Sequence, residues 1–478
     1  MATPTIIQYV KSSNTLYPVM ANNGVFRLRL PNPALAANCI VVWVTWGGVD
    51  STPTVTDDAG NTYHATTKSF SANGDGMYGF YAYNITAGAR VISIKNVSGS
   101  SQSYIQAMAI EFNNILTTDP IDGSNGHTAT SGTSLTAGSF TPAVSGDLVL
   151  QAVFLDFASP AGPWTKGADQ NNVSWSLIGA DTQDGFAVQW GIQTSHTAIN
   201  PHITTGTSGG DYVSAGMALK SASAGNTPAA GIRIIGIHHY SQPIDTETAQ
   251  DIVNPSTIQV PCLGNMLVLV NTSGPNAINI TGISDANGTW SQLGTGIDQG
   301  AAEELHVWVS PNHTPSAAQA ITITYDSITA GDACLLIYDI IGAATTQTGN
   351  TSATGGTKAT YASTIAGAAL TPGAANNLLL FVINQEQQTV ISCASSHGTA
   401  YFDAIEYDGM PVNGPQNCDQ NAGFCHIYNA DTTAAIITWT FEDGSKAQGV
   451  WAAYGVEIQA SSGGPLGSRS RWLGSRSR

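Results

Sequence analysis

Apolar stretches of strand length recur at regular intervals along the chain. Four of them begin at Cys39 ("CIVVWVTW"), Asp147 ("DLVLQAVF"), Asn265 ("NMLVLVNT") and Asn377 ("NLLLFVIN"), about 110 residues apart. None approaches the roughly 20 residues that a membrane-spanning helix requires. The spacing is that of a small all-β domain, so the pattern predicts four repeats.

Each predicted repeat continues with the same succession of segments. A turn with an aromatic residue comes next, then an alternating strand, then two closing strands, which in the first repeat read "ARVISIKNV" and "YIQAMAIEF". A period of two is that of a strand with one buried face, and no segment of comparable length has a helical period. We therefore predict an all-β chain of four tandem antiparallel β-sandwiches with a jelly-roll or immunoglobulin-like topology.

Polar linkers predict the domain boundaries. Segments rich in Gly, Ser, Thr and Pro, such as "SASAGNTPAAG", predict sandwiches at residues 1–116, 117–223, 224–343 and 344–460. Repeats one and three open alike, with "TIIQYVKSSN" and "RIIGIHHYSQ", whereas repeats two and four share "TAGSFTP" and "IAGAALTP" before their long strand. These similarities indicate that a block of two domains was copied once.

The first repeat carries a resemblance to known sequences. The order "VVWVTWGG", "TVTDDAGNTY", "YAYNITAG" and "YIQAMAIEF" resembles uncharacterised tandem β-sandwich repeat proteins of soil bacteria, and more loosely bacterial surface and phage structural modules. The likeness is clearest over this repeat and is one of pattern elsewhere. It implies the β-sandwich fold and brings no catalytic residue to this chain.

Composition narrows the range of partners. Only 10% of the residues are charged and the net charge is -17, so hydroxyl and amide groups dominate the surface. A nonspecific grip on nucleic acid or anionic lipid needs clustered Lys and Arg, so neither nucleic acid nor membrane insertion is expected. We expect a polysaccharide, a cell-surface glycan or copies of the chain itself as the partner.

The two ends of the chain bear on its location. No basic segment followed by an apolar core stands at the N-terminus, so no signal peptide is visible. The repetition and the low charge still favour an extracellular, cell-surface or virion location. Residues 461–478 form a basic Gly/Ser/Arg tail whose "GPLGS" is typical of a cloning remnant; if native, the tail would tether neighbouring acidic subunits.

The segment "VTDDAGNTY" contains the acid pair Asp57 and Asp58. The pair fits a calcium loop, a catalytic acid pair or a turn between strands. In the third repeat "ISDANGTW" places Asp285 and Trp290 alike, and an Asp-x-x-Gly turn needs no metal because Asp accepts hydrogen bonds from the backbone. Calcium wants six or more oxygens, so Asp57 and Asp58 are weak calcium candidates, and we expect a turn with an aromatic anchor and no cofactor.

The densest group of acids lies in "AYFDAIEYDG", where aromatic residues flank it. A paired-carboxylate hydrolase needs two acids facing one cleft. If the chain is a hydrolase, the candidate catalytic residues are Asp403, Glu406 and Asp408. No nucleophile elbow, zinc-protease motif or phosphate loop is present.

Aromatic residues supply the candidate ligand-binding positions. Most tryptophans stand at equivalent strand positions, which indicates core packing. Trp164 lies in the Pro-Gly segment "SPAGPWTKG", where an exposed ring would stack on a sugar, and Tyr401 and Tyr407 flank the acid group. Along "MYGFYAYN" the alternation is imperfect, so at least one ring is expected to face outward.

The six cysteines do not amount to a disulfide scaffold. Cys39, Cys262 and Cys334 stand in or beside apolar runs, as buried thiols do. Cys418 and Cys425 in "NCDQNAGFCHIYN" are the candidate disulfide, with Cys393 as a competing partner. The spacing of this segment matches no usual zinc site.

The leading functional hypothesis is a noncatalytic surface or particle structural protein. It would act in adhesion, glycan binding or self-assembly, because the chain is repetitive, low in charge and free of catalytic signatures. The alternative is a carbohydrate-active hydrolase with a paired-carboxylate site.

Overall fold

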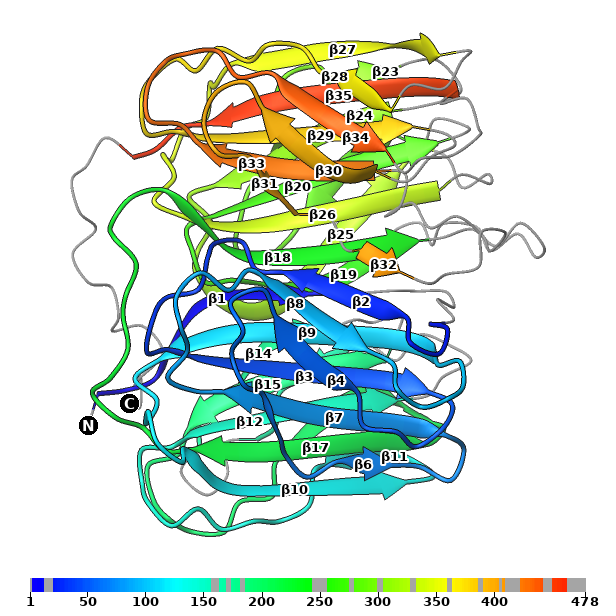
Figure 1. Ribbon diagram of the computed structural model, residues 1–478, viewed down its shortest axis with the longest axis vertical. Helices are drawn as coiled ribbons and strands as arrows, with labels where there is room; N and C mark the ends of the chain where they lie inside the picture. The colour runs from blue at the N-terminus through cyan, green and yellow to red at the C-terminus, as the bar shows by residue number, and fades with distance from the viewer. Residues whose placement is uncertain are drawn as a thin grey trace.

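The chain is built entirely of β-strands and their connections in the part that the structure describes (Figure 1). The computed structural model describes residues 2–12, 20–155, 163–168, 173–180, 185–242, 256–274, 279–298, 304–326, 332–358, 363–385, 390–403, 406–408, 422–441 and 449–461. The predicted all-β class is confirmed. A search of these residues finds no helix long and apolar enough to cross a membrane.

The strands follow one another in four successive groups. The first group is β1 (Thr5–Lys11), β2 (Val25–Arg29), β3 (Cys39–Gly47), β4 (Thr54–Asp57), β5 (His64–Ala65), β6 (Ser69–Phe70), β7 (Asp75–Ala82), β8 (Val91–Lys95) and β9 (Ser103–Asn113). The second is β10 (Ile121–Ala129), β11 (Gly132–Thr136), β12 (Leu148–Leu155), β13 (Trp164–Thr165), β14 (Ser176–Ala180), β15 (Phe186–Ile192), β16 (His202–Gly209) and β17 (Tyr212–Leu219). The third is β18 (Arg233–Gln242), β19 (Ser256–Cys262), β20 (Met266–Gly274), β21 (Ile280–Ser284), β22 (Ser291–Gln292), β23 (Ile297–Asp298), β24 (Glu304–Pro311), β25 (Ser316–Tyr325) and β26 (Asp332–Ile341). The fourth is β27 (Thr351–Lys358), β28 (Thr364–Ala366), β29 (Leu378–Gln385), β30 (Val390–Ser395), β31 (Tyr401–Phe402), β32 (Glu406–Asp408), β33 (Ala422–Tyr428), β34 (Ile437–Phe441) and β35 (Gly449–Ile458).

The same strand order recurs in each group. The longer strands pair as β1-β9-β3-β7, β10-β17-β12-β15, β18-β26-β20-β24 and β27-β35-β29-β33. A second set of strands pairs as β2-β8-β4, β11-β16-β13, β19-β25-β21 and β28-β34-β30. Further strands extend the first sets at one edge, namely β5 and β6, β14, β22 and β23, and β31. Every group therefore contributes one set of four strands, which we call its long strands, and one set of three strands.

A twelve-stranded sheet joins the first and third groups through strands β1 and β18. These two strands lie side by side and run parallel, with Tyr9 opposite Gly236 and Lys11 opposite His238. The other strand pairs of the described residues are antiparallel. The order outward from this pair is the same on both sides. In Figure 1 the first half of the chain lies below the β1–β18 pair and the second half above it.

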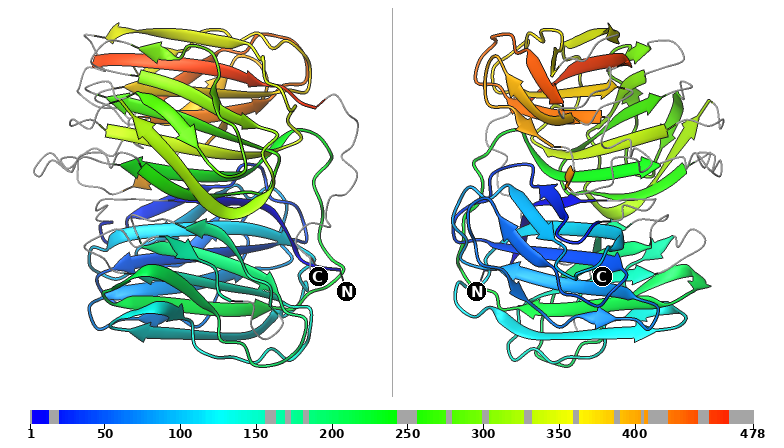
Figure 2. Two further views of the ribbon diagram at one scale, coloured as in Figure 1. Left: turned by 180° about the vertical axis from the view of Figure 1, so that it is seen from behind. Right: turned by 45° about the vertical axis from the view of Figure 1, so that its right-hand side comes forward.

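Two further backbone pairings connect the halves reciprocally. Strand β14 of the second group pairs with β19 of the third, at Ala180 and Gln259, which makes one eight-stranded sheet. Strand β32 of the fourth group pairs with β2 of the first, where Val25 lies opposite Asp408. Strand β14 belongs to the layer of long strands in its group, whereas β32 pairs only with β2 among the described strands, and each contact extends the three-stranded set of another group. Figure 2 shows the halves adjoining in two further views.

Burial on both faces explains the long apolar runs. All nine residues of β3 are buried, and successive side chains enter different clusters. Val42 and Val44 pack in the core that holds β2 and β8, whereas Val41 and Trp43 pack on the opposite face against β12, β15 and β17. A strand that is covered on both faces takes apolar residues at successive positions, so the alternation of polar and apolar residues is absent.

In three of the groups, a buried carboxylate binds the loop that precedes the third strand. Glu111, Asp339 and Glu457 occupy matching positions, opposite Ile40, Leu267 and Leu379, and are 0%, 0% and 1% exposed. Each accepts a backbone N–H from the loop before that strand. The donors are Leu35 to Glu111 at 2.9 Å, Gly264 to Asp339 at 2.9 Å and Gly373 to Glu457 at 2.8 Å.

The second group uses a different arrangement at this place. Ala218 stands where the others have an acid, and Asp122 on β10 accepts the loop amides of Ala143 and Val144 at 2.7 and 3.0 Å. The residue before the third strand is Asp147, whereas the other groups have Asn38, Asn265 and Asn377. Asp147 is fully buried, and neither of its oxygens accepts a hydrogen bond of normal geometry from a described residue.

The buried position of Asp147 favours the protonated form of its carboxyl group. Burial first, and then the neighbouring Asp122 carboxylate, raise the pKa of Asp147 to about 8. The folded protein therefore binds this proton more tightly than the unfolded chain, whose Asp pKa is about 3.9. The stabilising contribution is complete below pH about 4 and is lost as the pH rises through 8.

We predict that Asp147→Asn stabilises the protein at alkaline pH. An amide has no charge to bury and matches the residue of the other three groups, so the free energy of unfolding should rise by about 1 to 3 kcal/mol at pH 8. The gain should shrink toward pH 5, as measured by denaturant unfolding at both values. Asp119→Asn, at an exposed acid on the preceding loop, should change neither value; a gain for Asp147→Asn that does not depend on pH would contradict the assignment.

Candidate functional site

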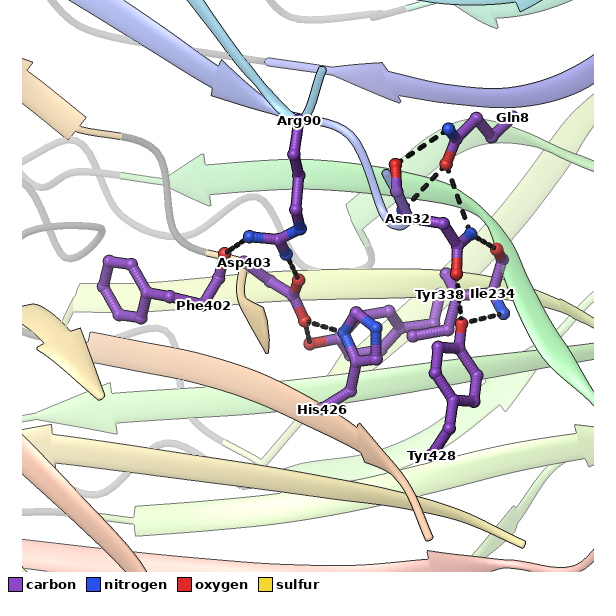
Figure 3. Close-up of polar contacts among 9 residues, drawn as sticks. All are labelled: Gln8, Asn32, Arg90, Ile234, Tyr338, Phe402, Asp403, His426 and Tyr428. Carbon is purple, nitrogen blue, oxygen red and sulfur yellow. Dashed lines mark hydrogen bonds and ion pairs between the residues drawn. The ribbon is translucent and has the colours of Figure 1, made fainter. Parts of the chain in front are cut away.

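Asp403 is the centre of a buried polar cluster that joins three parts of the chain (Figure 3). Its Oδ1 accepts a hydrogen bond from the Arg90 guanidinium at 2.7 Å, and its Oδ2 accepts one from the Tyr338 hydroxyl at 3.0 Å. His426 Nδ1 lies 2.7 Å from the same Oδ2. Arg90 also donates to the carbonyl oxygen of Phe402 at 2.8 Å.

The β-strands place these groups together from distant positions in the sequence. Asp403 directly follows β31, Arg90 directly precedes β8, and Tyr338 and His426 lie within β26 and β33. Asp58 fixes the backbone at the arginine, because its Oδ1 accepts the N–H of Arg90 at 2.8 Å. The cluster therefore connects the first, third and fourth strand groups at one point.

Charge and burial determine what the cluster can do. The Asp403 side chain is fully buried and that of Arg90 is 11% exposed, so the ion pair lies almost wholly in the interior. Burial first, and then the charge of Asp403, raise the pKa of Tyr338 well above its ordinary value. Because a carboxylate oxygen accepts hydrogen bonds, His426 donates to Asp403 through a proton on Nδ1, while its Nε2 is buried without a hydrogen-bond partner among the described residues.

Aromatic rings enclose this ion pair. The Arg90 guanidinium lies 5.1 Å from the Tyr401 ring, which stacks on His426 at 5.1 Å. Arg29 on β2 lies 5.2 Å from the Phe402 ring in the same way. The contact of Arg90 with the Tyr401 ring adds a cation–π interaction to the ion pair.

A second polar network lies beside the first and joins the same strand groups. Asn32 donates from its backbone to Gln8 Oε1 at 2.8 Å and from its amide to the carbonyl of Ile234 at 2.7 Å. The Tyr428 hydroxyl donates to Asn32 Oδ1 at 2.7 Å and accepts from the Ile234 N–H at 3.0 Å. We call the two networks together the polar junction; Figure 3 draws its main members.

The geometry of the polar junction suits cohesion between strand groups better than turnover. A general base must reach a substrate proton, directly or through one water. Asp403 is 1% exposed and His426 is 0% exposed, and each oxygen of Asp403 already has a partner. The Asp–His pair therefore has no open side among the described residues.

The other members of the predicted acid group take a different place. Glu406, Tyr407 and Asp408 form β32, which pairs with β2 through the backbone. Their side chains lie outside what the structure describes. Tyr401 is half-buried in the polar junction, so of the predicted group the structure brings together Asp403 and Tyr401.

The expectation of an exposed ring at Trp164 is wrong. Trp164 is 2% exposed and packs in the core between the two layers of the second strand group. Its backbone N–H and C=O bind the Gln259 side chain at 2.9 and 3.0 Å. Pairing with β16 and with Gln259 draws this segment inward although its Pro and Gly content suggested a loop.

The acid pair of the first group organises a turn. Asp57 Oδ1 accepts the backbone N–H groups of Ala59 and Asn61, each at 3.0 Å. Its Oδ2 accepts the Asn61 amide at 2.9 Å and the Tyr63 hydroxyl at 3.1 Å. Both oxygens thus bind donors of the turn and its aromatic anchor, so a calcium ion would have to compete with them.

The turn recurs in the third group, as the sequence predicted, and a related turn occurs in the fourth group, where the sequence did not reveal it. In the third group Asp285 accepts from the Gly288 N–H at 2.6 Å and from Trp290 Nε1 at 2.5 Å. In the fourth group Ser395 Oγ accepts the His397 N–H at 3.1 Å. Gly398 there has the same positive φ of 76° as Gly60 in the first group, a conformation that favours glycine.

The remaining candidate sites are a metal site and a disulfide bond. Among the described residues no three His, Cys, Asp or Glu side chains come together as a possible metal site. Cys418 lies outside the described residues, so its predicted disulfide with Cys425 stays a prediction. Cys39, Cys262, Cys334 and Cys425 are buried thiols, and Cys393 is a partly buried one.

Comparisons with known proteins found no similar family or structure. No family model, no curated protein and no solved structure matches the chain.

We predict that Arg90→Met destabilises the protein because it leaves the Asp403 carboxylate buried without its cation. The free energy of unfolding should fall by about 3 kcal/mol. Arg90→Met combined with Asp403→Asn should recover much of this loss, because no charge is then buried. Lys95→Met, at an exposed cation on neighbouring β8, is the control; denaturant unfolding that shows equal small losses for Arg90→Met and Lys95→Met would contradict a stabilising ion pair.

Proposed function

We propose that the chain is a noncatalytic structural protein of an extracellular surface, a cell surface or a virion, and that it acts through glycan adhesion or assembly. The observation that carries this proposal is the backbone pairing between strand groups, at β1–β18, β14–β19 and β2–β32. Such pairing favours one stiff body over four separately moving domains, as suits a load-bearing or displaying role.

The strand orders favour four β-sandwiches of jelly-roll type. In each group the first strand pairs with the last and the third with the sixth, while the second, seventh and fourth pair in the other set. This count takes the short strands of the turn region as one in groups one, three and four, namely β5 with β6, β22 with β23 and β31 with β32. This is the order of two nested Greek keys. The four sandwiches would correspond to residues 1–116, 117–223, 224–343 and 344–460.

The use of the ionisable groups supports a noncatalytic role. Catalytic acids and bases need contact with a substrate and a tuned pKa. Here several buried carboxylates hold loops, as Glu111 and Glu457 do, and Asp403 holds strand groups together.

A group of aromatic rings supports adhesion to glycans. His64 on β5 lies opposite Tyr81 on β7, and Tyr83 follows on the same face. The three rings lie within 5.2 to 6.1 Å of one another, with interplanar angles of 20° to 30°. His64 is exposed and Tyr83 half-buried, so part of the group faces solvent, and sugars stack on such rings.

We predict binding without hydrolysis. A glycan array probed with the whole chain should give hits, and the same glycans incubated with the protein should release no new reducing ends. Tyr83→Ala should weaken binding to the hits by about tenfold, the equivalent of a ring contact of about 1.4 kcal/mol, whereas Tyr83→Phe should keep it. Release of reducing ends would overturn the noncatalytic role, and binding that survives Tyr83→Ala would place the contact elsewhere.

A further inference from the structure

Two cysteines face each other across the fourth strand group. Cys393 on β30 lies opposite Trp439 on β34, and since cross-strand partners point the same way, both face the core. On β33 a Cβ added at Gly423 would meet Trp439 and Val390, so this residue faces the same core from the other layer. Cys425 stands two residues further along β33 and therefore also points toward β30.

The two strands that carry these cysteines contact each other. Cα atoms of β30 and β33 come within 8 Å of each other, near the range over which disulfides form. Cys393 packs against the cluster that contains Cys425, and both are thiols here. Burial first, and then the hydrogen bond with the Cys393 thiol, raise the pKa of Cys425, so the two side chains are neighbours.

We propose that Cys393 and Cys425 are a disulfide site that links the two layers of residues 344–460. The bond forms when a low-molecular-weight disulfide such as oxidised glutathione accepts two electrons. The two cysteine thiols lose two protons and two electrons, one S–S bond forms between them, and the oxidant's S–S bond breaks to give two thiols.

A disulfide between Cys393 and Cys425 would also affect the polar junction. The loop that it closes, residues 393–425, contains Asp403 and strand β32. Asp403 holds Arg90, and β32 pairs with β2, so this loop makes two of the contacts to the first strand group. The cross-link reduces the number of conformations that this loop can adopt. It therefore favours the contacts that the loop makes with the first strand group.

The raised pKa of Cys425 bears on when the bond forms. A buried thiol that resists ionisation is a poor nucleophile for exchange with external disulfides. The bond therefore forms while the chain folds, before β33 is covered, and persists afterwards as a structural link.

Peptide mapping of the whole chain tests the proposal. The chain is denatured, reduced and refolded in a mixture of oxidised and reduced glutathione, then unfolded with N-ethylmaleimide, digested and mapped by mass spectrometry. We expect a cross-linked peptide pair containing Cys393 and Cys425, and alkylation of the other four of the six cysteines (6 − 2 = 4). Alkylation of all six cysteines, or a link from Cys418 to Cys425, would overturn it.

Thermal unfolding separates the bond from the packing of the thiols. Reductant should lower the Tm of the oxidised protein by about 3 to 5 °C and leave that of Cys393→Ser unchanged. Cys39→Ala is the control, because this buried cysteine lies in β3 of another strand group and its substitution should lower the Tm equally with and without reductant. A Tm of the unsubstituted protein that does not respond to reductant would contradict the link.

Discussion

The backbone groups at the edge of a β-sheet are the constraint on which this structure depends. An edge strand presents a row of N–H and C=O groups that must bind water or another strand. In this chain edges of one strand group meet edges of another, at β1–β18, β14–β19 and β2–β32. The strand groups are consequently held by the interaction that forms each sheet.

The shared sheets explain the burial of polar side chains. Once β3 is covered on both faces, any polar group near it must find a partner inside the protein. Glu111 binds loop amides, Asp403 binds Arg90, and Asn32 joins Gln8 to Tyr428. Asp147 is the exception, and its raised pKa is the consequence of a buried carboxyl group without sufficient donors.

The reciprocal contacts also bear on the history of the chain. The first and third strand groups meet through equivalent strands, β1 and β18, as the subunits of a symmetric dimer do. Likewise β14 reaches β19 and β32 reaches β2, so each half lends a strand contact to the other. This arrangement is what the fusion of two copies of a two-domain block would leave.

The strand content was predictable from the sequence, and the contacts between strand groups were not. The four apolar runs and the alternating segments depend on local burial, which a period of two records, so the all-β class followed. Pairing between β1 and β18 or between β2 and β32 joins residues hundreds of positions apart, and the pattern does not show which edges meet. Trp164 was misplaced for the same reason, because the Gln259 side chain that binds its backbone lies in another strand group. Asp403 stood out as an acid among aromatics, but its partner Arg90 carried no signal.

Hydrogen exchange of backbone amides during denaturant unfolding tests most directly whether the strand groups form one body. If shared edges hold them, the amides of β3, β12, β20 and β29 should open with one common free energy that falls with one slope in denaturant. Opening of one half while the other stays protected would contradict this account.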